Sequence, residues 1–123
     1  MTLSAFALIL TGVLLNAAAQ LFLKAGTNTL GVVSFSTGEW FSQAVRVGLN
    51  PHIIGGMLCY AFSLVAWVMA LSRVPVSIAY PMLSIGYIVT AVAAYFLFGE
   101  SLGLTRWFGI GFIVIGVWLV SRP

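Results

Sequence analysis

Four long apolar segments dominate the sequence, with short polar connections between them. They cover about residues 3–23, 52–71, 76–98 and 104–120, and each approaches the roughly 20 residues that a helix needs to cross a bilayer. An isolated strand cannot satisfy its backbone hydrogen bonds in lipid, so we expect all four segments to be helices. The sequence therefore predicts an all-α membrane protein, in which residues 1–123 form a single domain of four transmembrane helices.

The composition excludes several other classes of protein. Only 6% of the residues are charged, against about 25% in an average soluble domain, so a water-soluble enzyme or a disulfide scaffold is not expected. The five Lys and Arg residues are scattered rather than clustered, which bears on membrane topology and not on nucleic acid. No cluster of metal-ligating residues, nucleophile beside a base or phosphate loop occurs. We therefore expect no enzyme activity, no metal and no cofactor.

The first connection, residues 26–50, is the longest. Its first part is polar and turn-forming, and residues 39–47 then place aromatic and aliphatic side chains on one helical side. This pattern predicts a short helix in the membrane interface with Trp40 at headgroup depth, and an ordered loop is the alternative. The pair Asn50 and Pro51 is a typical start for the next helix.

The basic residues orient the chain only weakly in the membrane. Arg73 and Arg122 share one expected side, and Lys24, Arg46 and Arg106 share the other. The cytoplasmic side of a membrane protein carries an excess of Lys and Arg, so this near-even split does not determine the orientation of the chain. Insertion in both directions, or antiparallel pairing with a related chain, is therefore a hypothesis.

The first apolar segment carries a polar or small residue at every fourth position. Gly12, Asn16, Gln20 and Lys24 follow this spacing, which places them along one stripe of a helix. Polar groups at membrane depth lack water, so such a stripe indicates function. Two amides and an ammonium suit an anion or a hydroxyl-rich head group. The alternative is that the amides hold helices together while Lys24 anchors the helix at the interface.

Two more segments have a polar face. The second carries Tyr60, Ser63 and Trp67 on one side, and the third carries Ser77, Tyr80, Ser84 and Tyr87. Packing between helices is again the alternative. Three polar faces in one small protein predict a shared polar cavity among the first three helices. Its expected substrate-binding residues are Asn16, Gln20, Lys24, Tyr60, Ser63, Trp67, Ser77, Tyr80 and Ser84.

Two features concern the shape and assembly of the bundle. Pro81 lies inside the third segment and has no N–H for the carbonyl of Ser77, so we expect a kink that is either a hinge or a tolerated bend. The fourth segment has Gly109 and Gly116 two helical turns apart on one face. Smooth glycine faces favour close contact between helices, so these two residues are the candidate dimer interface.

Acidic residues are absent from the apolar segments. Glu39 and Glu100 both fall in connections. Without an intramembrane carboxylate we expect no proton relay and no counter-charge for a cationic substrate. The predicted cavity is therefore neutral to basic and free of acid.

Motifs along nearly the whole chain, apart from the first connection, carry a family resemblance. The most specific is VPVSIAYPMLS at 74–84, and residues 16–24, 98–102, 107–109 and 116–117 also fit. These stretches resemble the small subunits of the aminoarabinose–undecaprenyl-phosphate flippase. Those subunits are EamA-like members of the drug/metabolite transporter superfamily, near the small multidrug resistance proteins.

The resemblance implies a four-helix protomer that acts as a dimer, often antiparallel, in the bacterial inner membrane. Its partner would be a second copy or a related four-helix chain, and its substrate a lipid-linked sugar. Asn16 stands where small multidrug exporters have an essential glutamate, and Leu83 where they have a tryptophan. Both departures count against proton-coupled drug export.

The leading expectation is a multi-pass subunit that translocates a polyprenyl-phosphate-linked sugar. Lys24 would attract the phosphate, the amides and hydroxyls of the cavity would bind the head group, and Trp67 would stack on a sugar ring. Two alternatives stay open. One is a small multidrug-type exporter of small solutes, and the other is a non-transporting membrane partner of a glycosyltransferase.

Overall fold

The computed structural model describes residues 2–31 and 38–122, and every regular element in these residues is an α-helix. The helices are α1 (Leu3–Leu30), α2 (Trp40–Leu49), α3 (Pro51–Leu71), α4 (Val76–Met82), α5 (Ser84–Phe98) and α6 (Leu104–Val120). The prediction of an all-α protein is confirmed. Within the described residues, three stretches are long and apolar enough to cross a membrane, namely α1, α3 and the pair α4–α5, whereas α6 is a shorter apolar helix of 17 residues.

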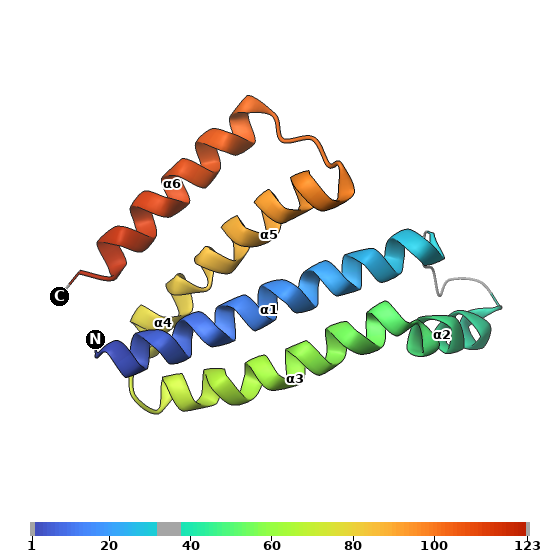
Figure 1. Cartoon of the computed structure of the whole chain (residues 1–123), viewed down its shortest axis with the longest axis horizontal. Coiled ribbons are helices and arrows are strands. Elements are labelled where there is room, and N and C mark those ends of the chain that lie inside the picture. The colour runs from blue at the N-terminus through green and yellow to red at the C-terminus, as the bar shows by residue number, and fades with distance from the viewer. Residues whose placement is uncertain (1, 32–37, 123) are drawn as a thin grey trace.

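The body of the molecule is the antiparallel pair α1 and α3, which lie side by side along most of their length (Figure 1). Small residues make this close approach possible, because they let helix backbones come together. Ala17 and Ala19 of α1 are buried, as are Gly56, Ser63 and Ala66 of α3. Helix α5 packs on the side of α1 away from α3 (Figure 1), and α4 contacts both α1 and α3.

Helix α1 is longer than the sequence pattern suggested, since it continues past residue 23 to Leu30. The sequence Lys24-Ala25-Gly26 does not end it. Gly26 is buried within the helix, and a Cβ there would lie 2.6 Å from Cδ1 of Ile53. The helix ends at Gly31, whose N–H still donates to the carbonyl of Thr27. Its φ of 80° takes the chain out of the helix in a conformation that glycine adopts readily.

Asn50 joins the far end of α1 to the start of α3. Its Oδ1 accepts from the N–H groups of His52 and Ile53, at 2.9 and 3.3 Å, and its Nδ2 donates to Oγ1 of Thr29 at 2.9 Å. The predicted helix start at Asn50 and Pro51 is thus where α3 begins.

The third apolar segment is interrupted near Pro81, as the sequence suggested. Regular α-helix stops at Met82 and resumes at Ser84, and Leu83 between them donates its N–H to the carbonyl of Tyr80 at 3.0 Å. Proline has no N–H to donate to the preceding turn, which weakens the helix at this point. The bond from Leu83 spans three residues instead of the four of a regular α-helix. Whether this break works as a hinge stays a prediction.

The connection from α1 to α3 contains a ten-residue amphipathic helix, α2, close to the predicted stretch 39–47. None of its residues is buried, and Trp40 is 58% exposed. Its depth in a membrane stays a prediction. Residues 32–37, in the part predicted to be turn-forming, lie outside the described residues.

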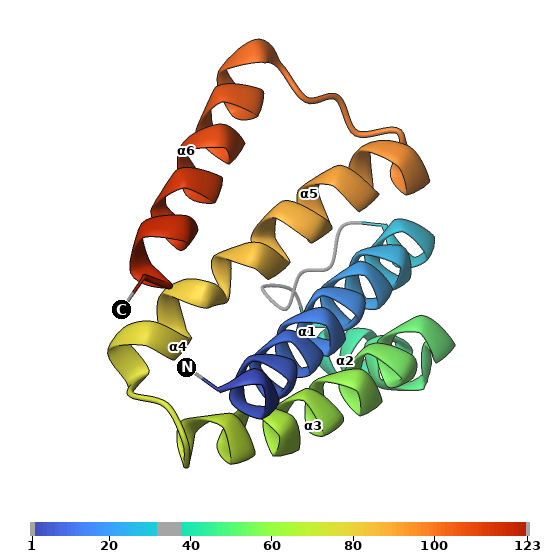
Figure 2. The same ribbon diagram turned by 60° about the vertical axis from the view of Figure 1, so that its left-hand side comes forward.

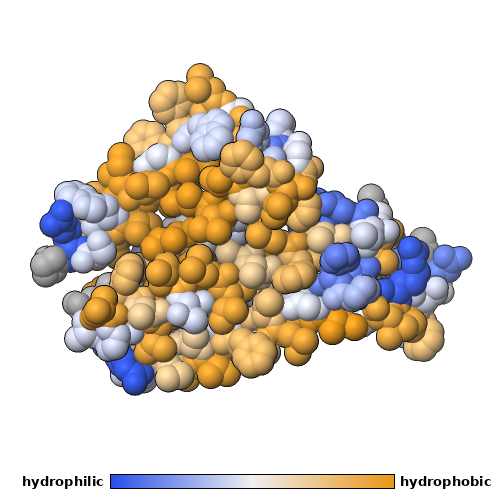
Figure 3. Space-filling model, viewed as in Figure 1, coloured by the Kyte–Doolittle hydropathy of each residue, from blue (hydrophilic) through white to orange (hydrophobic). Residues whose placement is uncertain are grey.

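Helix α6 lies on the outside of the molecule, where Figure 2 shows it apart from the α1–α3 pair. It contacts only α4 and α5, and none of its residues is buried. Figure 3 shows a continuous hydrophobic surface over the middle of the protein, with hydrophilic residues gathered at its two ends. This face, with the many exposed large hydrophobic side chains along the helices, is typical of a protein that sits in lipid.

Candidate functional site: a polar cavity between α1 and α5

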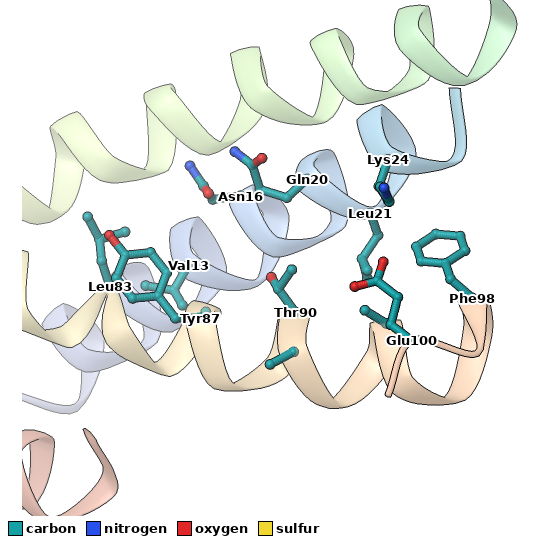
Figure 4. Close-up of a pocket in the computed structure, with 13 residues that line it drawn as sticks. Val13, Asn16, Gln20, Leu21, Lys24, Leu83, Tyr87, Thr90, Phe98 and Glu100 are labelled. Atoms are coloured by element: carbon teal, nitrogen blue, oxygen red, sulfur yellow. The ribbon is translucent and has the colours of Figure 1, made fainter. Parts of the chain in front are cut away.

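A cavity of about 720 Å³ lies between α1 and α5, and we call it the α1–α5 cavity. Its volume falls in the roughly 300–1,000 Å³ range of small-molecule sites. Of its thirteen lining residues, seven are apolar and six carry polar or charged side chains (Figure 4). The lining residues are Val13, Asn16, Gln20, Leu21, Lys24, Leu83, Gly86, Tyr87, Thr90, Ala91, Ala94, Phe98 and Glu100.

The polar stripe of α1 forms one wall of this cavity. Asn16, Gln20 and Lys24 all line it, in the order that their four-residue spacing dictates (Figure 4). Tyr87 and Thr90 line the facing wall, which belongs to α5. The cavity therefore offers two amides, two hydroxyls and an ammonium along one path.

An acidic residue also lines the cavity, so the prediction of an acid-free cavity is wrong. Glu100 lies at the same end as Lys24 (Figure 4). The reason is the turn at the end of α5, where Gly99 has a φ of 67° and both its N–H and that of Glu100 donate to the carbonyl of Ala94. This left-handed turn, which glycine adopts readily, brings the chain back over the end of α5.

A second, smaller pocket of about 200 Å³ lies among α1, α3 and α4, and we call it the α3–α4 pocket. Ser63 is 4% exposed, and its Oγ donates to the carbonyl of Tyr60 at 2.7 Å. The hydroxyl hydrogen is therefore used within the helix, and the oxygen remains an acceptor. The pocket is lined by Gly12, Asn16, Tyr60, Ser63, Leu64, Trp67, Tyr80 and Leu83.

The single shared cavity predicted from the three polar faces is thus two spaces in the structure. Asn16 and Leu83 line both of them, and Gln20 and Lys24 line only the larger. The structure brings Ser77 and Ser84 into neither space. The α4–α5 break lies where the two spaces meet: α4 contacts α3 as well as α1, whereas α5 contacts α1 and not α3.

Sequence reasoning missed three polar residues of the larger cavity. Tyr87 was placed on the polar face of its segment but not among the substrate-binding residues, and Thr90 follows it by three residues, which is one helical turn. That spacing could have identified Thr90. No spacing rule could have identified Glu100, because its position depends on the turn at Gly99.

A third pocket, of about 390 Å³, lies between α5 and α6. It shares Tyr87 and Glu100 with the α1–α5 cavity and adds Arg106 and Gly109. A Cβ atom on Gly109 or Gly116 would meet nothing within 4 Å. Both candidate dimer residues therefore face open space within the chain, and their contact with a second chain stays a prediction.

Comparison with known proteins finds a family model and several relatives that match the chain. Residues 1–122 match the model of the EamA-like transporter family. The chain is 39% identical over 119 residues to the probable 4-amino-4-deoxy-L-arabinose-phosphoundecaprenol flippase subunit ArnF of Shewanella sediminis. The alignment covers 89% of this chain and 82% of the relative. It is 31% identical over 107 residues to the probable subunit ArnE of the same flippase in Pseudomonas fluorescens, with 83% and 94% covered. No solved structure matches the chain.

Proposed function

Since the chain belongs to the EamA-like transporter family, we propose that it is a subunit of a flippase for a polyprenyl-phosphate-linked sugar. Its relatives are named as probable flippase subunits for 4-amino-4-deoxy-L-arabinose-phosphoundecaprenol, and the proposed substrate is of that type. The proposed location is the bacterial inner membrane, which the chain would cross several times. No covalent chemistry is involved, in keeping with a transporter.

The observation that carries the proposal is the line of Asn16, Gln20 and Lys24 along the α1–α5 cavity. The ammonium group of Lys24 is a point charge suited to binding phosphate. The carboxamides of Asn16 and Gln20 both donate and accept hydrogen bonds, as sugar hydroxyls do. The cavity lies on a protein whose outer surface is apolar (Figure 3). The head group would enter the cavity from the side while its polyprenyl tail stays in the surrounding lipid.

The α3–α4 pocket would hold part of the head group at another stage of translocation. It adjoins the larger cavity through Asn16 and Leu83, and it presents Trp67 as a surface for a sugar ring. Leu83 is also the residue at the break between α4 and α5. Bending near Pro81 would therefore reshape both spaces together, and alternating access of this kind is our proposal for how the lipid crosses.

Ser77 and Ser84 line neither space, so we propose that they contact the head group only after the third segment bends near Pro81. Ser77 is exposed and Ser84 half-buried in the described conformation.

We infer that the working unit is a dimer. Four helices, with α6 as the fourth span, are few to enclose a passage, and α6 has no buried residue and an open glycine face at Gly109 and Gly116. Relatives carry the names of two different subunits, ArnE and ArnF, which supports a related chain as the partner. A homodimer is the alternative assembly.

The proposal is tested by reconstituting the chain in lipid vesicles with labelled undecaprenyl-phosphate aminoarabinose, with and without a related four-helix chain. We expect the lipid to reach the opposite leaflet only when both chains, or a dimer of this one, are present. Movement of a soluble cation against protons would instead support a small-solute exporter. A stable dimer that moves neither would support a membrane partner of a glycosyltransferase.

A further inference from the structure

Two opposite charges line one end of the α1–α5 cavity. Lys24 comes from α1 and Glu100 from the connection after α5, and both side chains are directed toward the same space (Figure 4). Among the described residues they form no ion pair with each other. Two charges that share a cavity without neutralising one another are both available to a ligand.

The position of Glu100 is built into the fold. The left-handed turn at Gly99 and the two N–H groups that share the carbonyl of Ala94 fix the backbone that carries this carboxylate. Arg106 lies beside Glu100 in the α5–α6 pocket, and no ion pair joins them in the described part of the chain. The carboxylate therefore shares one pocket with each of two cations and forms no ion pair with either among the described residues.

The rest of the cavity sets the chemistry of the ligand. Next to the charged end come Gln20, Thr90 and Asn16, which suit hydroxyls. A ligand that satisfies the whole cavity carries a negative group, a positive group and hydroxyls between or beside them. Lys24 and Glu100 are both exposed at this end of the cavity, and each presents a sign of charge that a bound ligand has to match.

We propose that Glu100 binds the ammonium group of an aminosugar while Lys24 binds its phosphate, so that the cavity selects zwitterionic over purely anionic lipid-linked sugars. This inference rests on the proposed function and specifies its substrate class. An amine on a sugar is largely protonated near neutral pH, as an α-amino group is. A lipid-linked sugar without the amine would pair with Lys24 but leave Glu100 without a partner.

The test compares two lipids on the same protein. The probes are undecaprenyl-phosphate aminoarabinose and its N-acetyl derivative, which is uncharged at the nitrogen, and the readout is their dissociation constants for the chain and its partner in nanodiscs. We expect the amine form to bind about tenfold more tightly to the unaltered protein, the effect of one charge-assisted contact. In Glu100→Gln the ratio of the two constants should fall to within about twofold of one.

Glu39→Gln is the matched control, because it removes the same charge at the N-terminus of α2, away from the cavity. It should keep the tenfold ratio. If Glu100→Gln keeps the ratio, the inference is overturned while the proposed function stands. The same holds if the variant weakens the binding of both lipids equally, because that is the effect of a structural change in the cavity. If the unaltered protein binds neither lipid, the proposed function fails and this inference fails with it.

Discussion

Replacing Lys24 with glutamine should slow lipid movement by about 10- to 100-fold, because a hydrogen bond to a charged group contributes about 1.5–3 kcal/mol. Lys24 is the cation of the α1–α5 cavity, and the neutral amide would keep its approximate length without its charge. Lys24→Arg should retain most of the rate, since it keeps the charge. The measurement is the rate at which labelled undecaprenyl-phosphate aminoarabinose crosses reconstituted vesicles.

Arg46→Gln is the control for overall charge. Arg46 is exposed on α2 and does not line the α1–α5 cavity, so its loss should leave the rate unchanged. Equal rates for Lys24→Gln and Arg46→Gln would show that the cavity cation is not needed for transport.

Gly56→Leu should destabilise the protein by about 1–3 kcal/mol, the range for overpacking a well-packed contact. A Cβ on Gly56 would lie 3.0 Å from the backbone carbonyl oxygen of Ala19 and 3.1 Å from the side chain of Leu23. The carbonyl belongs to α1 and cannot move without the helix, so α1 and α3 would separate. Thermal unfolding in detergent, followed by circular dichroism, measures the loss.

Gly55→Leu is the matched control at the neighbouring position. The three atoms nearest to a Cβ there all belong to the ring of Phe22, at 3.6–3.9 Å. Phe22 is 42% exposed, so the ring can turn outward and the variant should unfold near the temperature of the unaltered protein. Equal destabilisation by the two substitutions would contradict the close α1–α3 contact at Gly56.

Periodicity in the sequence accounts for much of this arrangement. The four-residue spacing of Asn16, Gln20 and Lys24 was enough to place them on one wall, because the geometry of a helix alone fixes which residues share a face. The start of α3 and the bounds of α6 also followed from local signals, namely the Asn50–Pro51 pair and a continuous apolar run.

Features that depend on contacts between helices could not be predicted in this way. Gly26 looked like a helix end, but it lies inside α1 and packs closely against Ile53 of α3. Glu100 looked like a loop residue, and only the turn at Gly99 brings it to the cavity. The division into two spaces at Leu83 likewise depends on how α4 and α5 meet α1 and α3.

The central claim is that the α1–α5 cavity receives the head group of a lipid-linked sugar. Thr90 lines this cavity, and Cys59 is the only cysteine, so Thr90→Cys in a Cys59→Ala background provides a unique probe. Ser42→Cys, exposed on α2, is the control.

The measurement is the rate at which a thiol reagent labels each cysteine with and without undecaprenyl-phosphate aminoarabinose. We predict that the lipid slows labelling of Thr90→Cys about tenfold at about 90% occupancy and leaves Ser42→Cys unchanged. Labelling of Thr90→Cys at the same rate with and without a lipid that the protein transports would contradict the claim.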